Sequence, residues 1–316
     1  MKVLLLGANG QLGRSFIADG GLAARGELIA ASRDGVLAVG GNGEIADLSM
    51  PASLPALLDR VRPDVIVNAA AYTAVDRAEQ EEALATRVNG EAVGVLGRWA
   101  AAHVALVIHY STDYVFDGRQ SQPYAVDAPT VPLGAYGRSK LAGEQALRGS
   151  GADHLTFRTA WVYAAHGHNF LRTMLRLGAE REELRVVADQ HGAPTDTGLI
   201  VRGTLAALDR WLQADGAQRH AVAGTHHLVA SGMTTWHGFA EAIFADAVGR
   251  RLIARAPRVT AITTADYPTP AERPAWSVLD NTDFQRQFAV SLPDWRDGLH
   301  RVMAQLGSKP DDPRSR

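Results

Sequence analysis

Short apolar segments alternate with longer amphipathic segments throughout the first half of the sequence, and this alternation narrows the choice of fold more than any other feature. Segments that are apolar on both faces are typical of buried parallel strands. Strands that alternate with helices predict an α/β fold of the Rossmann type, a doubly wound parallel sheet covered by helices on both faces. The predicted strands lie at residues 3–6, 28–31, 64–68, 104–109 and 154–157, and the predicted helices at 11–19, 51–61, 83–102 and 135–147.

The alternation loosens after about residue 160, where a helix at 169–183 is followed by segments rich in turn residues. We therefore predict an NAD(P)-binding Rossmann domain at 1–160. A smaller α/β domain at 161–307 would mainly bind the substrate, with some of its chain returning to the Rossmann core. The remaining segment, 308–316, is charged and contains two prolines, which predicts a flexible tail.

The composition of the chain excludes several classes of function. The chain has 316 residues, a formal net charge of -2 and no cysteine, so disulfides and cysteine-ligated metals are excluded. A nearly neutral chain is not expected to bind nucleic acid through bulk charge. The sequence has no apolar run long enough to span a bilayer, and the apolar N-terminus reaches glycine too soon for a signal peptide. We expect a cytoplasmic protein without a membrane partner.

A glycine-rich turn follows the first predicted strand and opens the first predicted helix. Gly7, Gly10 and Gly13 form a G-x-x-G-x-x-G pattern. Glycine lets the backbone turn sharply and approach a pyrophosphate, and the helix N-terminus presents N–H groups to it. The spacing alone also suits a purely structural turn, but its position at the head of an alternating α/β half favours a dinucleotide site.

The end of the second predicted strand bears on which cofactor is bound. NAD-binding domains place an acidic residue there for the ribose 2′-OH, whereas this chain has Ser32 and Arg33. A hydroxyl and a guanidinium suit a 2′-phosphate, so NADPH is favoured and NADH stays possible. The alternative is that Arg33 is a solvated surface charge. Asp47 and Leu48, which follow a short third strand, would flank the adenine.

Tyr136 and Lys140 are the candidate reacting pair. Their four-residue spacing places both on one face of a predicted helix. A neighbouring ammonium favours the phenolate and should lower the pKa of the tyrosine toward working pH. Tyr136 could then protonate a carbonyl oxygen while a hydride reaches the adjacent carbon. The pair alone is weak evidence because such spacing also stabilises helices.

Polar residues after the predicted strand 104–109 strengthen the case for a catalytic site. Thr112 and Asp113 follow the apolar segment 104–109, and parallel sheets bind ligands beyond the carboxyl ends of their strands. Thr112 could donate a hydrogen bond to a substrate carbonyl oxygen. Asp113 could cap a turn, hold a sugar hydroxyl or take part in proton transfer. Asn89, in the predicted helix 83–102, lies near the site or bonds to backbone.

The sequence resembles the extended short-chain dehydrogenase/reductases, and within them the dTDP-4-dehydrorhamnose reductases, from Met1 to about Arg301. The residues that carry the resemblance are RPDVIVNAAAYTAVD at 62–76, YSTDYVFDG at 110–118, AYGRSKLAGE at 135–144, FRTAWVY at 157–163, DQHGAPT at 189–195 and YPTPAERPAWSVL at 267–279. The resemblance implies reduction of the C4 ketone of dTDP-4-dehydro-β-L-rhamnose to dTDP-β-L-rhamnose, a precursor of cell-surface polysaccharide, by a reduced nicotinamide cofactor.

The resemblance also implies roles for individual residues. Tyr136 would be the proton donor, Lys140 would tune its pKa and anchor the nicotinamide ribose, and Thr112 would contact the carbonyl oxygen. Cofactor contacts are implied for Gly10, Gln11, Leu12, Ala71, Tyr72, Thr73 and Tyr110. Substrate contacts are implied for Asp113, Trp161, Gly192, Pro194 and Arg273.

Two departures from the family pattern concern a metal. Some members of the family dimerise around Mg²⁺ held by carboxylates, but the corresponding positions here are Ser15 and Arg296. Oxygen ligands suited to a hard cation are missing at both places, so we predict no metal site and leave open a monomer or a homodimer.

Rival functions on the same fold are a different 4-ketoreductase, a dehydratase or an epimerase. Dehydratases commonly have a second carboxylate after Asp113, where this chain has Tyr114. This argues against dehydration and leaves epimerisation open. A non-catalytic regulatory or binding relative is disfavoured by the intact Thr112, Tyr136 and Lys140, although fold alone does not fix function.

Overall fold

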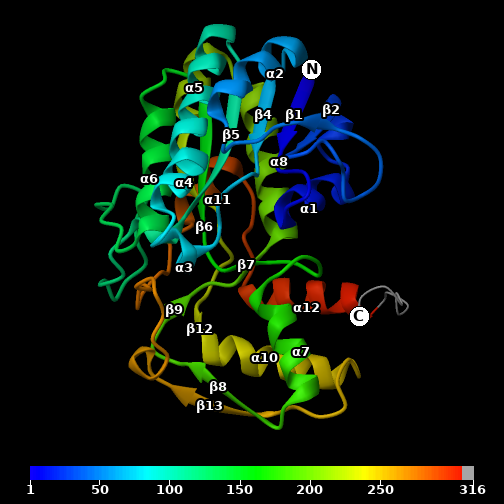
Figure 1. Ribbon diagram of the computed structural model, residues 1–316, viewed down its shortest axis with the longest axis vertical. Helices are drawn as coiled ribbons and strands as arrows, with labels where there is room; N and C mark the ends of the chain where they lie inside the picture. The colour runs from blue at the N-terminus through cyan, green and yellow to red at the C-terminus, as the bar shows by residue number, and fades with distance from the viewer. Residues whose placement is uncertain (308–316) are drawn as a thin grey trace.

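The centre of the protein is a seven-stranded parallel sheet with the strand order β11-β6-β5-β4-β1-β2-β3 (Figure 1). The computed structural model describes residues 1–307. The sheet confirms the predicted α/β class. Its strands are β1 (Lys2–Leu6), β2 (Glu27–Ser32), β3 (Glu44–Ile45), β4 (Val65–Asn68), β5 (Leu106–Thr112), β6 (His154–Thr159) and β11 (Gly224–His227).

Helices cover both faces of the sheet because its strands are apolar on both sides. Val3 and Leu5 of β1 pack into one cluster, and Leu4 and Leu6 pack into another, as the two-residue period of a strand requires. The first cluster includes residues of α1 (Gln11–Asp19), α8 (Thr197–Gln213) and α11 (Thr282–Phe288). The second includes residues of α2 (Leu54–Val61), α5 (Ala92–His103) and α6 (Ala135–Arg148).

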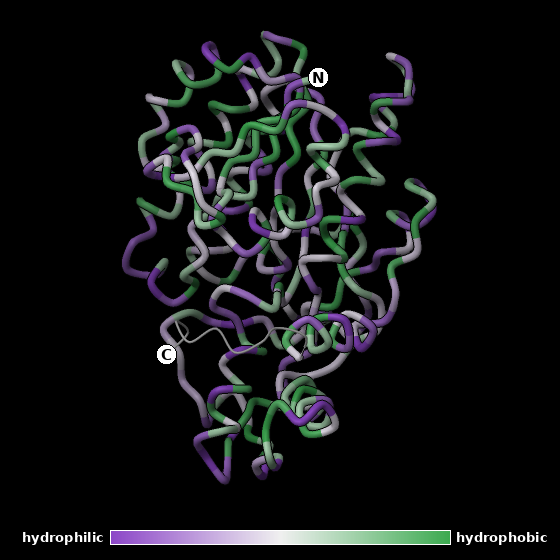
Figure 2. The backbone as a smooth tube through the Cα atoms, turned by 90° about the vertical axis from the view of Figure 1, so that its right-hand side faces the viewer, coloured by the Kyte–Doolittle hydropathy of each residue, from purple (hydrophilic) through white to green (hydrophobic). Residues whose placement is uncertain are grey.

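The smaller lobe contains three two-stranded sheets and three helices, and lies below the main sheet in Figure 1. Figure 2 shows hydrophobic segments gathered in the main sheet, with a smaller hydrophobic group in this lobe. Its strand pairs are β7 (Val162–Tyr163) with β10 (Thr195–Asp196), β8 (Glu183–Val187) with β13 (Arg258–Ile262), and β9 (His191–Gly192) with β12 (Thr234–Thr235). Its helices are α7 (Phe170–Glu180), α10 (Trp236–Gly249) and α12 (Trp295–Gly307).

Several predicted elements have different bounds in the structure. The predicted helix 169–183 is α7, which ends at Glu180, and Glu183 begins β8. The predicted helix 83–102 is divided into α4 (Glu82–Thr86), a π-helical turn (Arg87–Glu91) and α5. The predicted strand 104–109 begins at Leu106 and runs on to Thr112, because Val104 has a left-handed conformation (φ 57°) that ends α5. The remaining short elements are α3 (Val75–Ala78), α9 (Gly216–Val222) and 3-10 turns at Ala23–Arg25, Pro51–Ser53, Asp113–Val115 and Thr264–Asp266.

Part of the C-terminal half returns to the main sheet. Strand β11 pairs with β6, and α8 packs against α1. The proposed division at residue 160 stays a prediction, and the predicted tail at 308–316 lies outside the described residues. No helix within residues 1–307 combines the length and the apolarity needed to cross a bilayer.

Candidate active site

The candidate site begins where β5 ends. Thr112 is buried, and its hydroxyl donates to Asp113 Oδ1 at 2.9 Å and accepts from the Tyr114 N–H at 3.2 Å. The bond from Tyr114 caps the 3-10 turn Asp113–Val115, so Thr112 is the residue that caps the turn, and the role considered for Asp113 falls to its neighbour. The Asp113 Oδ2 atom is buried and makes no hydrogen bond within residues 1–307. A buried oxygen without a donor is suited to accept a hydrogen bond from a ligand.

Helix α6 brings Tyr136 to the same place. Its first turn packs tightly on the turn after β5, since a Cβ atom at Gly137 would lie 2.2 Å from the carbonyl oxygen of Tyr114. The ring of Tyr114 meets the ring of Tyr136 edge-on, with centroids 5.6 Å apart. The Thr112 hydroxyl is also close enough to affect the pKa of Tyr136. Thr112, Asp113 and Tyr136 therefore form one cluster.

Lys140 lies behind this cluster and is 2% exposed. Its Nζ donates a hydrogen bond to the carbonyl oxygen of Tyr110, which fixes the side chain between α6 and β5. Burial lowers the pKa of Lys140 to about 8, and the charge of Glu144 opposes this shift. The side chain is therefore mostly an ammonium at neutral pH.

The pKa of Tyr136 differs from the sequence-based expectation. Burial raises the pKa of its phenol above 10, the negative charge of Asp113 raises it further, and interaction with Thr112 lowers it. Desolvation of the phenolate outweighs the effect of Thr112, and the expected lowering by Lys140 is not among the interactions that shift this pKa. Tyr136 is therefore protonated at neutral pH. Burial also raises the pKa of Asp113 to about 6, against the effect of the side chains of Ser277 and Thr112.

The glycine-rich turn lies beside the end of β4. Gly7 has φ 78°, and a Cβ atom there would lie 2.6 Å from the Ala70 N atom. A Cβ atom at Gly13 would lie 2.2 Å from the carbonyl oxygen of Gly7. Gly10 occupies the N-cap of α1. Both the left-handed backbone and the close approaches require glycine, and they leave the N-terminus of α1 suited to a pyrophosphate.

Neighbouring predicted cofactor residues are already held in place by the fold. Gln11 Oε1 accepts from Asn169 Nδ2 at 2.7 Å, and Leu12 is partly buried against the core. Asp47 accepts from the backbone N–H of Ser49 at 2.9 Å, and Leu48 is buried.

The end of β2 carries a serine whose hydroxyl is already hydrogen-bonded and an exposed arginine. Ser32 is buried, and its hydroxyl lies 2.9 Å from the carbonyl oxygen of Val36 and 3.1 Å from Asp34 Oδ1. Its single proton is used inside this turn, so the predicted role of Ser32 toward a 2′-phosphate would require the turn to rearrange. Arg33 is exposed. The acidic Asp34, which the sequence analysis did not consider, lies next to it.

The segment after β4 is held by Asn89, which the sequence analysis placed near the site or on backbone. Its side chain accepts from Tyr72 N at 2.9 Å, donates to Tyr72 O at 3.0 Å and donates to Ser139 Oγ at 3.0 Å. Asn89 lies in the π-helical turn, a feature often found at functional sites. It thereby fixes the predicted cofactor residues Ala71, Tyr72 and Thr73 relative to α6. The Tyr72 hydroxyl donates to Glu81 at 2.7 Å.

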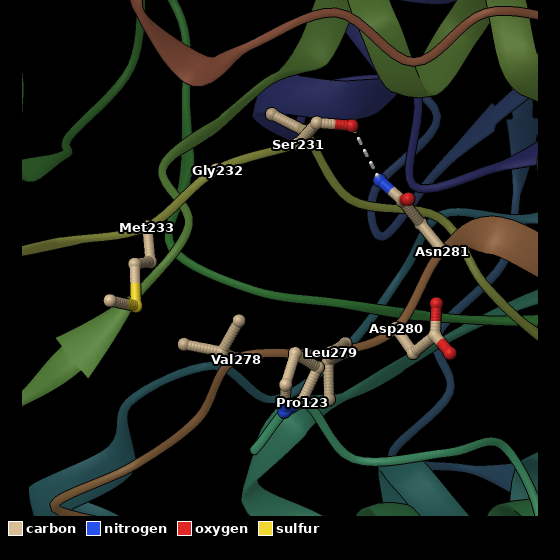
Figure 3. Close-up of a pocket in the computed structure, with 9 residues that line it drawn as sticks. Pro123, Ser231, Gly232, Met233, Val278, Leu279, Asp280 and Asn281 are labelled. Atoms are coloured by element: carbon tan, nitrogen blue, oxygen red, sulfur yellow. Dashed lines mark hydrogen bonds between the residues drawn. The ribbon is translucent and has the colours of Figure 1, made fainter. Parts of the chain in front are cut away.

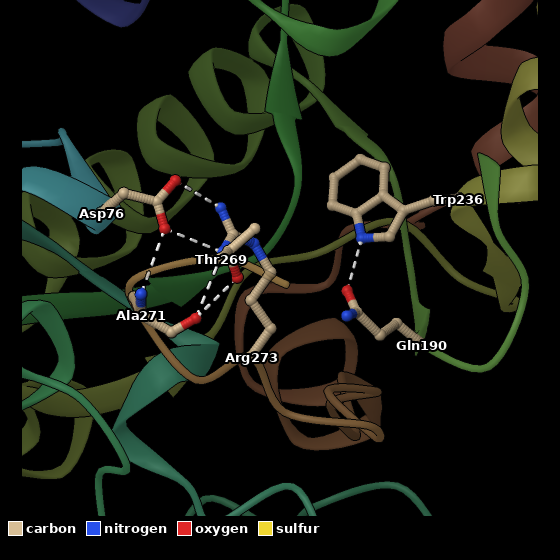
Figure 4. Close-up of polar contacts among 6 residues, drawn as sticks. All are labelled: Asp76, Gln190, Trp236, Thr269, Ala271 and Arg273. Atoms are coloured by element: carbon tan, nitrogen blue, oxygen red, sulfur yellow. Dashed lines mark hydrogen bonds and ion pairs between the residues drawn. The ribbon is translucent and has the colours of Figure 1, made fainter. Parts of the chain in front are cut away.

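Trp161 takes an unusual backbone conformation at the junction of the two lobes. Its φ is 48°, and its indole stacks on Trp236 with ring centroids 3.5 Å apart and an interplanar angle of 3°. The Trp236 indole N–H donates to Gln190 at 3.1 Å (Figure 4). Gly192 is packed so closely on the indole of Trp161 that a Cβ atom at Gly192 would lie 2.5 Å from that ring. The predicted substrate residue Pro194 is buried nearby in the chain.

Arg273 belongs to a long connection, residues 263–278, which we call the strap. The Arg273 guanidinium makes two hydrogen bonds to the Asp76 carboxylate, at 2.9 and 3.0 Å, and one to Thr269 Oγ1 at 2.7 Å (Figure 4). Asp76 lies in the first turn of α3 in the Rossmann half, so the pair ties the strap to that half. The predicted role of Arg273 as a substrate contact stays a prediction, and the sequence analysis missed its partner.

A separate pocket of about 260 Å³ lies beside the end of the strap (Figure 3). Ser231, Met233 and Val278 are among its lining residues, and none of the predicted site residues lines it. The Ser231 hydroxyl accepts from Asn281 Nδ2 at 3.1 Å and is thus already used in the fold. We do not assign the reaction to this pocket.

The residues at the family's metal positions do not fit Mg²⁺. Ser15 donates its hydroxyl to Thr197 Oγ1 at 2.8 Å, and Arg296 carries a positive charge and pairs with Asp294. Within residues 1–307 no group of three or more His, Cys, Asp or Glu side chains is arranged to hold a metal ion.

A doubly wound parallel sheet with threonine, tyrosine and lysine together at its carboxyl edge defines an extended short-chain dehydrogenase/reductase. Residues 1–308 match the family described as the RmlD substrate binding domain. The dTDP-4-dehydrorhamnose reductase of Burkholderia thailandensis is 48% identical over 300 residues, which cover 94% of this chain and 96% of that protein. This chain belongs to the dTDP-4-dehydrorhamnose reductase family.

Solved structures agree with this assignment. A dTDP-4-dehydrorhamnose reductase from Clostridium acetobutylicum has a TM-score of 0.85 and 32% identity, with 97% of this chain and 99% of that chain covered. The enzyme of the same name from Bacillus anthracis, in complex with NADP, has a TM-score of 0.82 and 29% identity, with 96% and 99% covered.

Proposed function

We propose that this protein reduces the C4 ketone of dTDP-4-dehydro-β-L-rhamnose to dTDP-β-L-rhamnose with NADPH. The observation that carries the proposal is the cluster of Thr112, Asp113 and Tyr136 at the end of β5, with Lys140 anchored behind it. Membership of the reductase family supports the substrate, and the NADP complex of the Bacillus anthracis relative supports the cofactor.

NADPH would supply a hydride to C4 of the sugar. The residues that would hold it are the glycines of the turn, whose close packing leaves room for a pyrophosphate at the N-terminus of α1, together with Arg33 at the end of β2. Their geometry fits a dinucleotide, because side chains at Gly7 and Gly13 would overlap the backbone that forms the turn.

Residues of the chain itself would supply the proton that the ketone oxygen takes up. The raised pKa of Tyr136 keeps its phenol protonated, which is the form that can give a proton to the oxygen of the former ketone. The ammonium of Lys140 favours the phenolate that remains. Thr112 would turn its hydroxyl from Asp113 toward the same oxygen and stabilise the developing negative charge. Asp113 Oδ2 would accept a hydrogen bond from a sugar hydroxyl.

A coupled assay tests the proposal. The purified chain is mixed with dTDP-4-dehydrorhamnose generated in place, and loss of NADPH absorbance is followed together with the sugar product. We expect one NADPH to be consumed for each sugar reduced. Consumption with another 4-ketosugar nucleotide but not with this one would refute the substrate, and turnover without net NADPH loss would indicate an epimerase.

The Tyr136→Phe variant tests the proton donor. We expect it to fold and bind NADPH normally but to lose at least about 100-fold in kcat, since general acid catalysis contributes about 10² to 10⁴. Near wild-type turnover would refute this role. The cytoplasmic location and the choice between monomer and homodimer stay predictions.

A further inference from the structure

A buried ion pair lies directly beneath the candidate site. Glu144 of α6 is 1% exposed and Arg158 of β6 is 2% exposed. The guanidinium donates two hydrogen bonds to the carboxylate, Nε to Oε1 at 3.0 Å and Nη2 to Oε2 at 2.8 Å. The Ser111 hydroxyl donates to the same Oε1 atom. One carboxylate thus receives three directed hydrogen bonds from two neighbouring strands.

The partners of Glu144 adjoin the residues proposed to react. Glu144 lies one helical turn after Lys140 on α6, so both side chains point from the same face of the helix. Ser111 immediately precedes Thr112 on β5. Arg158 also donates from Nη1 to the carbonyl oxygen of Val126 at 2.8 Å, in the connection that leads into α6. The cluster therefore joins the helix, both strands and that connection.

We propose that Glu144 is a positioning residue, which with Ser111 and Arg158 holds α6 in register with β5 so that Tyr136 and Lys140 meet Thr112. This inference rests on the proposed reductase function. Buried ion pairs contribute little net stability compared with apolar residues of similar size, because desolvation of the two charges offsets their attraction. Their directed hydrogen bonds nevertheless fix one geometry.

Apolar packing alone would fix this register less well. Glycine and alanine line the contact of α6 with α5 and with the π-helical turn before it: Gly94 of α5 faces Ala146, and Gly90 of the turn faces Ala142. Small side chains allow helices to approach closely but offer few interlocking shapes to resist a slide. A shift of about 1 Å at reacting groups can cost on the order of 100-fold in rate. Directed bonds from Glu144 to β5 and β6 oppose such a shift.

The charge of Glu144 has a second effect on the site. It opposes the lowering of the Lys140 pKa that burial causes. Removing this charge while keeping the shape of the side chain should therefore lower the pKa of Lys140 further. The other charged or titratable groups around this interior are Tyr136 on α6, His109 on β5, His154 and Arg158 on β6, and Asp113 after β5.

Two variants separate the geometric effect from the charge effect. Ser111→Ala removes one hydrogen bond and keeps the ion pair, so we expect kcat to fall about three- to tenfold with both KM values within about twofold. Glu144→Gln removes the charge, so we expect a larger fall in kcat and a basic limb of the kcat–pH profile that moves to lower pH. The basic limb of Ser111→Ala should stay in place.

Glu82→Gln is the matched control. Glu82 pairs with Arg138 on the outer face of α6 at 2.7 Å, and both side chains are exposed. Its loss removes an ion pair from the same helix without touching β5 or β6. We expect wild-type kcat and an unchanged pH profile. NADPH binding followed by fluorescence and a thermal unfolding curve establish that each variant is folded.

The outcomes distinguish this inference from the proposed function. Absence of NADPH consumption by the wild-type protein refutes the function. A reductase whose folded Ser111→Ala variant keeps wild-type kcat refutes the positioning role and leaves the function intact. Because Glu144→Gln leaves Arg158 unpaired in the interior, that variant could fail to fold, and Ser111→Ala then decides alone.

Discussion

The bond between the strap and the Rossmann half gives a quantitative prediction. Asp76 and Arg273 form a bidentate pair whose side chains are 39% and 23% exposed. At about 4 Å two unit charges attract by roughly 4 kcal/mol in a medium of dielectric constant near 20. Desolvation and solvent screening offset most of this, so Asp76→Asn should cost about 1–2 kcal/mol in the free energy of unfolding.

A double-mutant cycle measures this coupling. Urea unfolding of the wild type, Asp76→Asn, Arg273→Gln and the double variant should show that the double variant loses about as much as either single variant. Glu180→Gln, which breaks an exposed pair with Arg176, should change stability by less than about 0.5 kcal/mol. A looser strap should also raise the KM for the sugar nucleotide and leave the KM for NADPH unchanged.

The pH dependence of the pair has a defined sign. Hydrogen bonds from Arg273 lower the pKa of Asp76 below the ordinary value of 3.8 for an aspartate. The stabilisation is therefore fully present above the pKa of the unfolded carboxyl group and is lost as the pH falls through the lower folded value. A coupling energy below about 0.5 kcal/mol at pH 7, together with an unchanged KM for the sugar nucleotide, would refute the reasoning.

Two further predictions concern the cofactor and the buried carboxyl group. Arg33→Ala should weaken NADPH binding more than NADH binding, by about 1–2 kcal/mol, because only NADPH presents a 2′-phosphate to the guanidinium; equal losses in titration calorimetry would show that Arg33 does not bind it. Asp113 has a folded pKa of about 6 against the ordinary value of 3.8 for an aspartate, so its ionisation costs the folded protein about 3 kcal/mol at pH 7. This cost grows as the pH rises from about 4 to 6, and the stability of the wild type relative to Asp113→Asn should fall over that window in urea unfolding; a constant difference would contradict the raised pKa.

The sequence predicts the parts of the fold that have strong local patterns. Five strands of the main sheet, β1, β2, β4, β5 and β6, are short apolar segments between amphipathic helices, whereas β3 and β11 are not. The glycines at 7 and 13 stand where the backbone requires glycine. The small lobe is built on strand pairs such as β7 with β10, each two residues long, which is too short to show a period of two. The break in the predicted helix 83–102 depends on Asn89, whose partners lie far along the chain.

Candidate site residues can be predicted from the sequence where they lie in one short segment. They are harder to predict where their hydrogen-bond partners lie far away in the sequence. Tyr136 and Lys140 share one helix, and Thr112 ends a buried strand. By contrast, Asp76 lies 197 residues from Arg273, and no local pattern pairs them. Glu144, which the sequence analysis did not consider, stands four residues after Lys140, and no local pattern indicates that β5 and β6 supply its hydrogen-bond donors.

The seventh strand of the main sheet has a consequence for how the chain folds during synthesis. Strand β11 is made about 65 residues after β6, the strand it pairs with. Until residue 227 leaves the ribosome, β6 is an open edge that offers unpaired backbone groups to other chains. The main sheet is therefore completed only after most of the chain that builds the other lobe has been made.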